Sequence, residues 1–243
     1  MPEGPSIIIL KEEVQIFKGK KVIEVSGNSK IDQQRLLNGK VIDFKSWGKH
    51  FLICFKGFTV RVHFLLFGTY RVNEVKSTPP RLHLQFQKGE LNFYACSIRI
   101  IDEPLNEIYD WTADIMNEKW DPKRAIKKLK DQPDSRVLDV ILDQNIFSGA
   151  GNIFKNEVPF RIKVHPMSRI GALPPSKLKA LVNETHQYSF DFYGWKKQFV
   201  LKKNWLAHTK RTCPRCKIPL IKEYLGKTSR RTFYCKKCQV LYE

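Results

Sequence analysis

Four cysteines near the carboxyl end constrain the fold of this 243-residue chain more than any other feature. They form two Cys-x-x-Cys pairs, Cys213 with Cys216 and Cys235 with Cys238, and 18 residues separate the pairs. This spacing is typical of a structural zinc site with four thiolate ligands, built from two turns of a small β ribbon. Such a ribbon cannot bury a core, so one bound Zn²⁺ would hold it folded. A disulfide pair is the alternative, but nothing indicates the oxidising compartment that it requires.

Positive charge is concentrated in the same part of the chain. Residues 196–243 hold fourteen Lys or Arg and two acidic residues, which accounts for +12 of the formal net charge of +19. Aromatic residues are interleaved with these charges, among them Trp205, Tyr224, Phe233 and Tyr234. A solvated basic tail would not need aromatic residues. The pattern therefore predicts a polyanion as the partner, most commonly a nucleic acid.

The rest of the composition predicts a globular protein, because 42% of the residues are hydrophobic and 12% are aromatic. No run of 18 apolar residues and no signal-peptide pattern occurs in the sequence. We therefore expect a cytoplasmic protein without a membrane partner, associated with the nucleoid as in bacteria. A monomer is the default expectation.

The amino-terminal half follows an alternating pattern. A helix is expected over residues 7–17, ended by Gly19, and a short one over 32–37. Between Lys20 and about Ile101, short runs of alternating or continuous apolar residues are separated by turn signals, which predicts a β-sandwich or barrel. The expected strands are 22–25, 41–44, 51–55, 60–64, 82–86 and 91–94.

The second half has helical patterns. Asp121-Pro122 and Pro133-Asp134-Ser135 each begin a helix, and Pro174-Pro175 begins the longest one, which Gly194 ends. Gly149 and Gly151 precede a further helical run that starts at Asn152. Exposed backbone N–H groups at such a start bind phosphate well. The alternative is an ordinary helix–helix connection with a glycine C-cap, and the spacing alone favours that alternative.

The amino terminus itself is a candidate for chemistry. If Met1 is removed, Pro2 carries a free secondary amine, which titrates near pH 8 and is a potential nucleophile. Its condensation with a sugar aldehyde would give an iminium, an electron sink, and Glu3 would lie beside it as proton donor or acceptor. Many chains begin with Met-Pro for no catalytic reason, so this hypothesis needs support from the rest of the sequence.

That support comes from a set of motifs that follow one another along the whole chain. The motifs are Met1-Pro-Glu-Gly-Pro5, Gly48-Lys49, Asp143-Gln144, Gly149-Ala-Gly-Asn152, Glu157, Ser229-Arg230-Arg-Thr-Phe-Tyr-Cys235 and Gln239. Taken together and in this order, they resemble the formamidopyrimidine-DNA glycosylase and endonuclease VIII family from end to end. Gly4 stands where the formamidopyrimidine branch usually has leucine, so the chain is more similar to endonuclease VIII.

The resemblance implies an α+β multidomain fold. The expected parts are an N-terminal β-sandwich catalytic domain with an N-terminal helix over residues 1–110, a helical helix-two-turns-helix DNA-binding domain over 111–205, and a C-terminal zinc-ribbon finger over 206–243. In this family DNA lies in the cleft between the parts.

The resemblance also assigns roles to residues. Pro2 would attack C1′ of a damaged nucleotide with Glu3 as acid-base partner, Lys49 would supply positive charge and a proton, and Arg230 would bind phosphate and promote the second elimination. The expected DNA-binding set is Gly151, Asn152, Glu157 and the void-filling residues Leu65, Leu66 and Phe67. For the last three, core packing on a strand is the alternative.

The implied function is a bifunctional DNA glycosylase and AP lyase of base excision repair, acting on double-stranded DNA with damaged bases or abasic sites. Ser6 departs from the family, which usually has glutamate there, and this puts part of the acid-base support in doubt. The compact segment 194–212 leaves little chain for a lesion-capping loop, which favours oxidised pyrimidines. The alternatives are the same chemistry on oxidised purines, and a protein that binds damaged DNA without reacting.

Overall fold

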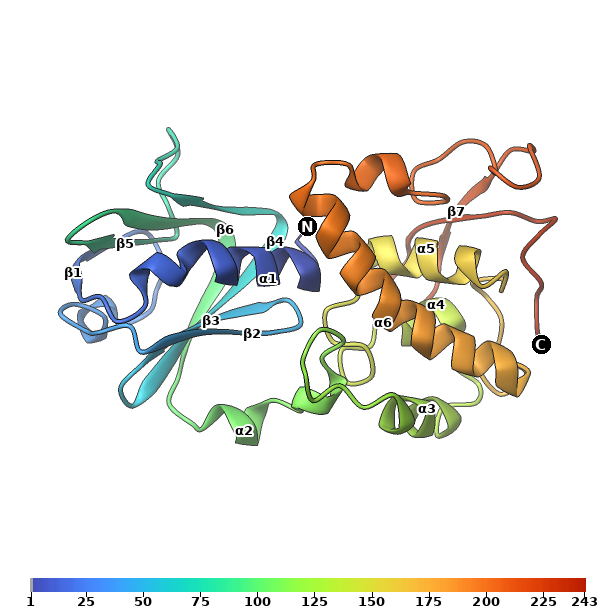
Figure 1. The fold of residues 1–243 in the computed structure, drawn as a ribbon, viewed down its shortest axis with the longest axis horizontal. Coiled ribbons are helices and arrows are strands. Elements are labelled where there is room, and N and C mark those ends of the chain that lie inside the picture. Colours follow the sequence, from blue (N-terminus) through green and yellow to red (C-terminus); the bar gives the residue numbers. More distant parts are fainter. Residues whose placement is uncertain (1) are drawn as a thin grey trace. The chain divides into compact units, whose positions relative to one another are not determined.

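The computed structural model describes residues 2–243, and the chain divides into two compact units. The first unit, Met1–Tyr109, contains the β-sheet; the second unit, Asp110–Glu243, contains most of the helices and a small hairpin (Figure 1). The boundary expected at residues 205 and 206, between a helical domain and a finger, stays a prediction.

Six antiparallel strands of the first unit form one sheet in the order β1-β5-β6-β4-β3-β2. Each of the six predicted strand segments overlaps one of its strands, because alternation of apolar residues is a local signal that a half-buried strand must satisfy. The segment predicted at 41–44 overlaps β2 only at Asp43 and Phe44. β4 and β6 are longer than predicted. The strands are β1 (Val22–Ser26), β2 (Asp43–Trp47), β3 (His50–Phe55), β4 (Phe58–Val72), β5 (Leu82–Phe86) and β6 (Glu90–Ile101).

The sheet changes direction where the pairing of β4 and β6 is interrupted, between Phe64 and Thr69 of β4. Ala95 of β6, opposite the interruption, has a φ of 47°. On one side of the interruption, residues 90–93 of β6 pair with β5. On the other side, residues 58–63 of β4 pair with β3. Both halves contribute to one apolar core, in which the rings of Phe51 and Phe93 lie 5.9 Å apart. The expected two layers are therefore joined as one hydrogen-bonded sheet.

Helix α1 (Gly4–Glu13) and the 3-10 segment Val14–Phe17 cover this core, and α1 packs against β2 and β3 (Figure 1). Leu10 is fully buried, and Phe17 stacks on Phe86 at 4.3 Å between ring centroids. The helix begins three residues earlier than predicted, with Pro5 in its first turn, where proline's missing N–H costs nothing.

The prediction of a helix over residues 32–37 is wrong. Only a 3-10 segment, Gln33–Arg35, forms there, with the Asp32 side chain accepting the N–H of Gln34. A segment this short lacks the turns needed to propagate an α-helix. After β6, α2 (Leu105–Ile108) ends the first unit.

The second unit contains α3 (Pro122–Lys130), α4 (Val137–Val140), α5 (Asn152–Arg161) and α6 (Pro175–Lys197), with 3-10 segments at Trp111–Ala113 and Leu201–Asn204. The predicted start at Pro122 is confirmed, since the carboxylate of Asp121 accepts the N–H groups of Lys123 and Arg124. The helix predicted after Pro133 is shorter than its apolar pattern indicated. Buried residues of α3 to α6 form one core.

Gly194 does not end the longest helix, contrary to the prediction. α6 continues to Lys197 and ends in a Schellman motif, in which the N–H groups of Phe199 and Val200 bond to the carbonyls of Lys196 and Trp195. Phe199 has a φ of 59°, the conformation that a helix end needs and that glycine adopts most easily. The position of the turn, rather than the presence of a glycine, decides where the helix ends.

The last strands, β7 (Ile221–Leu225) and β8 (Arg230–Tyr234), form a two-stranded hairpin next to the cysteines. Among residues 2–243, no helix is both long and apolar enough to cross a membrane.

Candidate functional site

Pro2 and Glu3 lie directly before α1. Pro2 is half-buried, while Glu3 is 2% exposed, and its carbonyl accepts the N–H of Ser6 at 2.8 Å. Because α1 is anchored on the sheet core, the start of the chain is held by a rigid element. The expected removal of Met1 concerns a residue outside those that the structure describes.

Lys49 lies in a tight turn of the same unit. Gly48 and Lys49 are the two residues that connect β2 to β3, and Gly48 has a φ of 51°. Two-residue hairpin turns need a positive φ at a central position, which glycine adopts without strain. Since α1 packs on β2 and β3, the strands that flank Lys49 also support the helix that follows Pro2.

A cluster of rings surrounds the base of this turn. His50 and His63 are paired across β3 and β4, with ring centroids 5.0 Å apart, and His50 Nδ1 lies 3.2 Å from the Tyr109 hydroxyl. Burial, with additions from Arg61, His63 and Lys49, lowers the pKa of His50 to about 3. Burial also lowers the pKa of His63, so both rings are neutral at pH 7. The positive charge of this cluster therefore comes from Lys49 and Arg61.

Sequence reasoning missed the two histidines. In β4, His63 alternates with buried apolar residues, so the sequence pattern alone places its side chain on the face of the strand opposite the core. This position was a signal that could have identified His63. The pairing with His50 was not available, because it depends on the register of two strands.

Leu65, Leu66 and Phe67 lie at the interruption of β4 and are 52%, 63% and 83% exposed. The alternative of core packing is therefore wrong. Gly68 follows, and a Cβ there would come within 2.7 Å of the Ala95 carbonyl oxygen, so the backbone is closely packed beneath the exposed side chains. Such apolar side chains on a closely packed turn suit insertion between base pairs, and this role stays a prediction.

The start of α5 has the features of an anion site. Gly151 is its N-cap, no side chain caps the helix, and Gly149 has a φ of 102°. Gln144 shapes the preceding loop: its amide accepts the Gly149 N–H at 3.1 Å and donates to the Ala150 carbonyl at 3.1 Å. α4 ends at Val140, so these glycines are not the C-cap of that helix. The first turn of α5 thus presents backbone N–H groups and the positive end of the helix dipole.

Glu157, which was expected to bind DNA, is a buried residue, and a contact with DNA stays a prediction. Its carboxylate is fully buried and accepts the backbone N–H groups of Leu206, Ala207 and His208 at 2.8 to 3.0 Å. Arg161 lies 3.6 Å from the same carboxylate. The role of Glu157 is therefore to hold the segment before the first cysteine pair.

The two residues before Glu157 hold strand β8. Lys155 Nζ donates to the Arg230 carbonyl at 3.1 Å and to Thr232 Oγ1 at 2.9 Å, and Asn156 Oδ1 accepts the Phe233 N–H at 2.7 Å. The Arg230 side chain remains exposed. Burial, with a smaller effect of Arg230, lowers the pKa of Lys155 to about 8. Sequence reasoning missed both residues, although three successive polar residues inside a helical pattern were a signal.

The four cysteines are brought together. Their Sγ atoms all lie within 4.8 Å of one another, and those of Cys213 and Cys238 are 3.8 Å apart. A tetrahedral zinc site with Zn–S bonds of about 2.3 Å has sulfurs about 3.8 Å apart, so the residues present fit Zn²⁺. Burial opposes ionisation of Cys213, but the N–H groups of Cys216 and Arg215 lower its pKa to about 7. This favours the thiolate that a metal needs.

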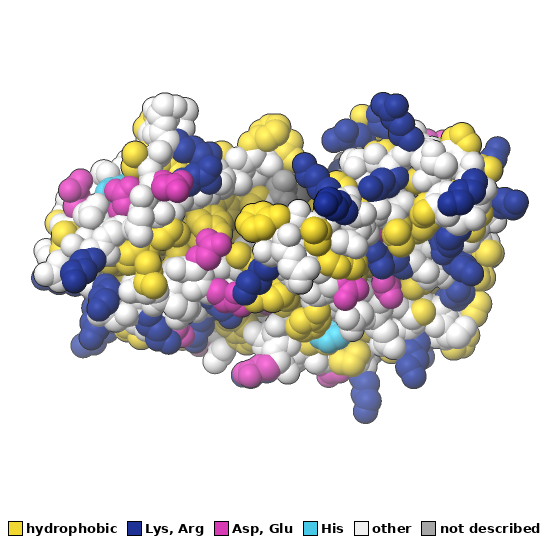
Figure 2. Space-filling view, turned by 45° about the horizontal axis from the view of Figure 1, so that its top comes forward, with side chains coloured by type: hydrophobic (Ala, Val, Ile, Leu, Met, Phe, Trp, Pro, Cys, Tyr) yellow, Lys and Arg dark blue, Asp and Glu magenta, His cyan; other side chains and the backbone are white. Residues whose placement is uncertain are grey.

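The candidate residues thus form two groups. Pro2, Glu3 and Lys49 belong to the first unit, together with the exposed residues 65–67. Asn152 and Arg230 belong to the second unit, where the contacts of Lys155 join α5 to β8. The Lys and Arg side chains of the second unit are numerous on the face drawn in Figure 2.

No family model matches the chain. Similar proteins include Endonuclease 8-like 2 of Bos taurus, 33% identical over 198 residues, which cover 74% of this chain and 58% of that protein. Endonuclease 8-like 3 of Xenopus laevis is 28% identical over 231 residues, covering 90% of this chain and 38% of that protein. The chain therefore spans about half the length, or less, of these relatives.

Solved structures share the fold. A viral DNA glycosylase superposes with a TM-score of 0.85, at 19% identity, covering 98% of this chain and 100% of that one. Formamido-pyrimidine DNA glycosylase of Lactococcus lactis, bound to DNA containing an AP site, superposes with a TM-score of 0.86, also at 19% identity, covering 98% and 99%.

Proposed function

Because the chain belongs to the formamidopyrimidine-DNA glycosylase and endonuclease VIII family, we propose that it is a bifunctional DNA glycosylase and AP lyase. Its substrate would be double-stranded DNA that contains oxidised bases, chiefly pyrimidines, or abasic sites. The observation that carries this proposal is the position of Pro2 and Glu3 directly before the buried helix α1, in the unit that also carries Lys49 on a tight turn.

The reaction would begin at the Pro2 nitrogen once Met1 is removed. The nitrogen attacks C1′, the glycosidic bond breaks, and the departing base takes up a proton. Glu3 suits the exchange of protons at the sugar, because it is adjacent in sequence and held by α1. Ring opening leaves an iminium between Pro2 and the sugar.

Strand cleavage would follow from the iminium. It acidifies the C2′ proton, whose loss expels the 3′ phosphate by β-elimination. A second, δ-elimination expels the 5′ phosphate, and hydrolysis releases Pro2. Lys49 would supply positive charge near the sugar, and the neutral His50 and His63 do not add to that charge. Arg230 would bind phosphate and favour the second elimination.

DNA binding would use both units. The uncapped start of α5 at Gly151 and Asn152 and the exposed Arg230 suit phosphate oxygens. Leu65, Leu66 and Phe67 suit the gap left by a flipped nucleotide, because they are apolar and exposed. One Zn²⁺ on the four cysteines would supply a structural crosslink for the finger.

Borohydride trapping tests the proposed chemistry. The protein with Met1 removed, incubated with abasic-site duplex, is expected to form a covalent adduct on reduction. A matched variant with Glu inserted before Pro2 keeps Met1, turns the Pro2 nitrogen into an amide, and is expected to form none while still binding the duplex. Equal adduct in both proteins, or none in either, would contradict the proposal; binding without adduct would favour a non-catalytic damaged-DNA-binding protein.

A lesion panel tests the substrate. α6 extends to Lys197 and a 3-10 segment follows at Leu201–Asn204, so few residues before the finger remain for a loop over the base. We expect faster base release from thymine glycol than from 8-oxoguanine. Glu3→Gln should slow base release by about 10² to 10⁴ and should leave the adduct with abasic DNA much less affected. Faster release of 8-oxoguanine would assign the chain to oxidised purines instead.

A further inference from the structure

The second edge of β6 borders an open slot in the first unit. Residues Cys96 to Ile101 pair with β4 on one side, while β5 pairs with β6 only as far as Phe93. Among the described residues, no strand pairs with the other edge of residues 96–101. An unpaired edge presents alternating N–H and C=O groups that another strand can bind.

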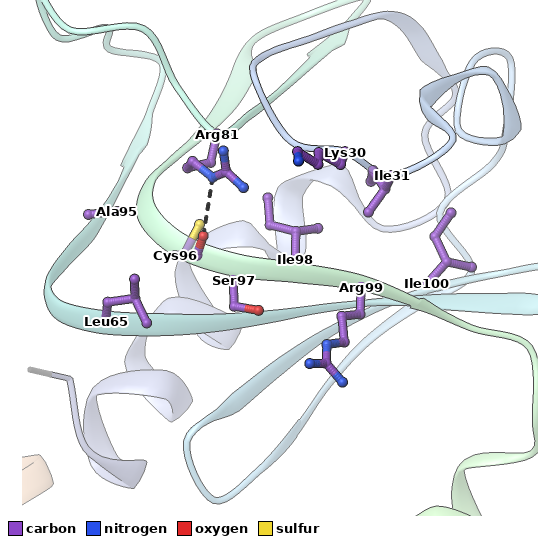
Figure 3. Close-up of a pocket in the computed structure, with 10 residues that line it drawn as sticks. All are labelled: Lys30, Ile31, Leu65, Arg81, Ala95, Cys96, Ser97, Ile98, Arg99 and Ile100. Atoms are coloured by element: carbon purple, nitrogen blue, oxygen red, sulfur yellow. Dashed lines mark hydrogen bonds between the residues drawn. The ribbon is translucent and has the colours of Figure 1, made fainter.

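A loop forms the opposite wall of this slot. It begins at Gly27, where the N–H groups of Asn28 and Ser29 bond to the carbonyls of Pro80 and Arg81, and it continues to Lys30 and Ile31. A cavity of about 620 Å³ separates Lys30 and Ile31 from residues 97–100 of β6 (Figure 3).

Two arginines tie the walls together at the ends of the slot. The Arg81 guanidinium donates to the Asn28 carbonyl at 2.8 Å and to the Cys96 carbonyl at 3.4 Å. At the other end, Arg35 forms an ion pair with Asp102, the residue after β6. Between these two contacts, the edge of β6 is open, and the contacts fix the loop relative to the strand.

The side chains of the slot have two kinds of surface. Ile98 and Ile100 point towards the side of Ile31, whereas Arg99 points the opposite way, as alternation along a strand requires (Figure 3). Lys30, Arg81 and Arg99 are cationic, and none of the ten residues that line the cavity is acidic. Arg99 and Lys30 are exposed, so their charges are available to a ligand.

We propose that this slot binds an extended, acidic segment of a partner protein, which adds to β6 as an extra strand. Its backbone would pair with residues 97–100, its alternate apolar side chains would meet Ile31, Ile98 and Ile100, and its acidic side chains would meet Arg99. Lys30, on the side of Ile31, would add to the positive charge that attracts the segment. A strand edge matches the spacing of a peptide backbone, so the geometry favours a peptide over a nucleic acid. This interaction does not depend on the proposed glycosylase activity.

The first experiment measures binding of a labelled peptide of alternating valine and aspartate by fluorescence anisotropy, at low salt. We expect saturable binding, and weaker binding of a matched peptide with lysine for aspartate. Lys30→Glu and Arg99→Glu should each weaken binding of the aspartate peptide about threefold or more. The double variant should prefer the lysine peptide, which also shows that it is folded. Lys56→Glu, in the turn between β3 and β4, is the matched control and should change nothing.

Hydrogen exchange on the unmodified protein gives a second, independent test. The aspartate peptide should slow exchange of amides within residues 97–100 and leave the turn at Lys56-Gly57 unchanged. No binding, or binding without protection of 97–100, overturns the proposal. One further result would overturn the proposal: duplex DNA displaces the peptide, and Arg99→Glu weakens the binding of DNA but not the binding of the peptide. The slot would then belong to a nucleic-acid surface.

Discussion

The two units hold their candidate residues by different means. In the first unit, Lys49 is held by the backbone pairing of β2 and β3, and Pro2 and Glu3 by a helix packed on an apolar core. In the second unit, the start of α5 and Arg230 are held by buried polar side chains, Lys155 and Asn156, beside a hairpin that lies next to four clustered cysteines. Apolar packing is insensitive to pH and metal, so those conditions should affect the second group of residues more.

Metal removal should have the largest effect. Zinc binding contributes about 10 to 16 kcal/mol in zinc-finger peptides, so chelation or Cys235→Ser should unfold residues 206–243. Limited proteolysis and mass spectrometry would locate the cleavage, and a metal assay would give one zinc per chain beforehand. Cys54→Ser, in β3, is the matched control. Equal protection of the finger with and without metal would remove the proposed contrast between the units.

Glu157→Ala should have the next largest effect. It removes the acceptor for three backbone N–H groups and leaves Arg161 without its buried partner, which costs about 3 to 5 kcal/mol of unfolding free energy. Glu184→Ala is the matched control, because Glu184 also pairs with Arg161, at 3.9 Å, but is partly exposed; it should cost less than about 1 kcal/mol. Urea denaturation measures both. If Glu157→Ala left the stability unchanged but weakened DNA binding, the result would favour a direct contact between Glu157 and DNA.

Lys155 should make the stability of the second unit depend on alkaline pH. Its pKa is about 8 when folded and 10.5 when unfolded, so the unfolded chain binds more protons between these values. The stability of the unit therefore rises as pH increases from 8 to 10.5, by up to about 3 kcal/mol. In Lys155→Met this rise should disappear, as measured by hydrogen exchange of the second unit. The same rise in both proteins would show that Lys155 is not desolvated.

Phe67→Ala should have the smallest effect on stability, within about 0.5 kcal/mol, because the side chain is 83% exposed. If residues 65–67 fill the gap left by a flipped nucleotide, as proposed, Phe67→Ala should slow base release from duplex DNA. The same substitution should leave trapping on a single-stranded abasic site unchanged. Phe64→Ala, three residues earlier and 2% exposed, should instead cost about 3 to 5 kcal/mol. Similar stability losses for the two would contradict the assignment of residues 65–67 to the surface.

Local sequence signals predicted much of this architecture. Alternation located five strands well and overlapped the sixth, β2, at two residues; the Asp121-Pro122 pair located a helix start, and cysteine spacing located the cluster that could hold zinc. Errors occurred where a local signal was overruled by its surroundings. Gly194 continues a helix that ends in a turn at Phe199. The six strands join in one sheet because β4 and β6 continue through an interruption that alternation does not reveal.

The candidate site was predictable in its residue types and less so in their roles. Pro2, Lys49, Asn152 and Arg230 stand in recognisable motifs, and their proposed roles stay predictions, of which borohydride trapping tests that of Pro2. Glu157 stands in a motif too, but only the structure shows that its carboxylate is buried among the N–H groups of residues 206–208. The same holds for Lys155 and for the pair His50 and His63.

The sequence by itself determined the elements of this protein, its family resemblance and the cysteine cluster, because periodicity, capping and ligand spacing are short-range properties of the chain. The tertiary structure decided which polar groups are buried against which partners, and which edge of β6 stays open. Burial and pairing join residues that are far apart in sequence, as Lys155 and Thr232 are, and their energies depend on desolvation that no local pattern records.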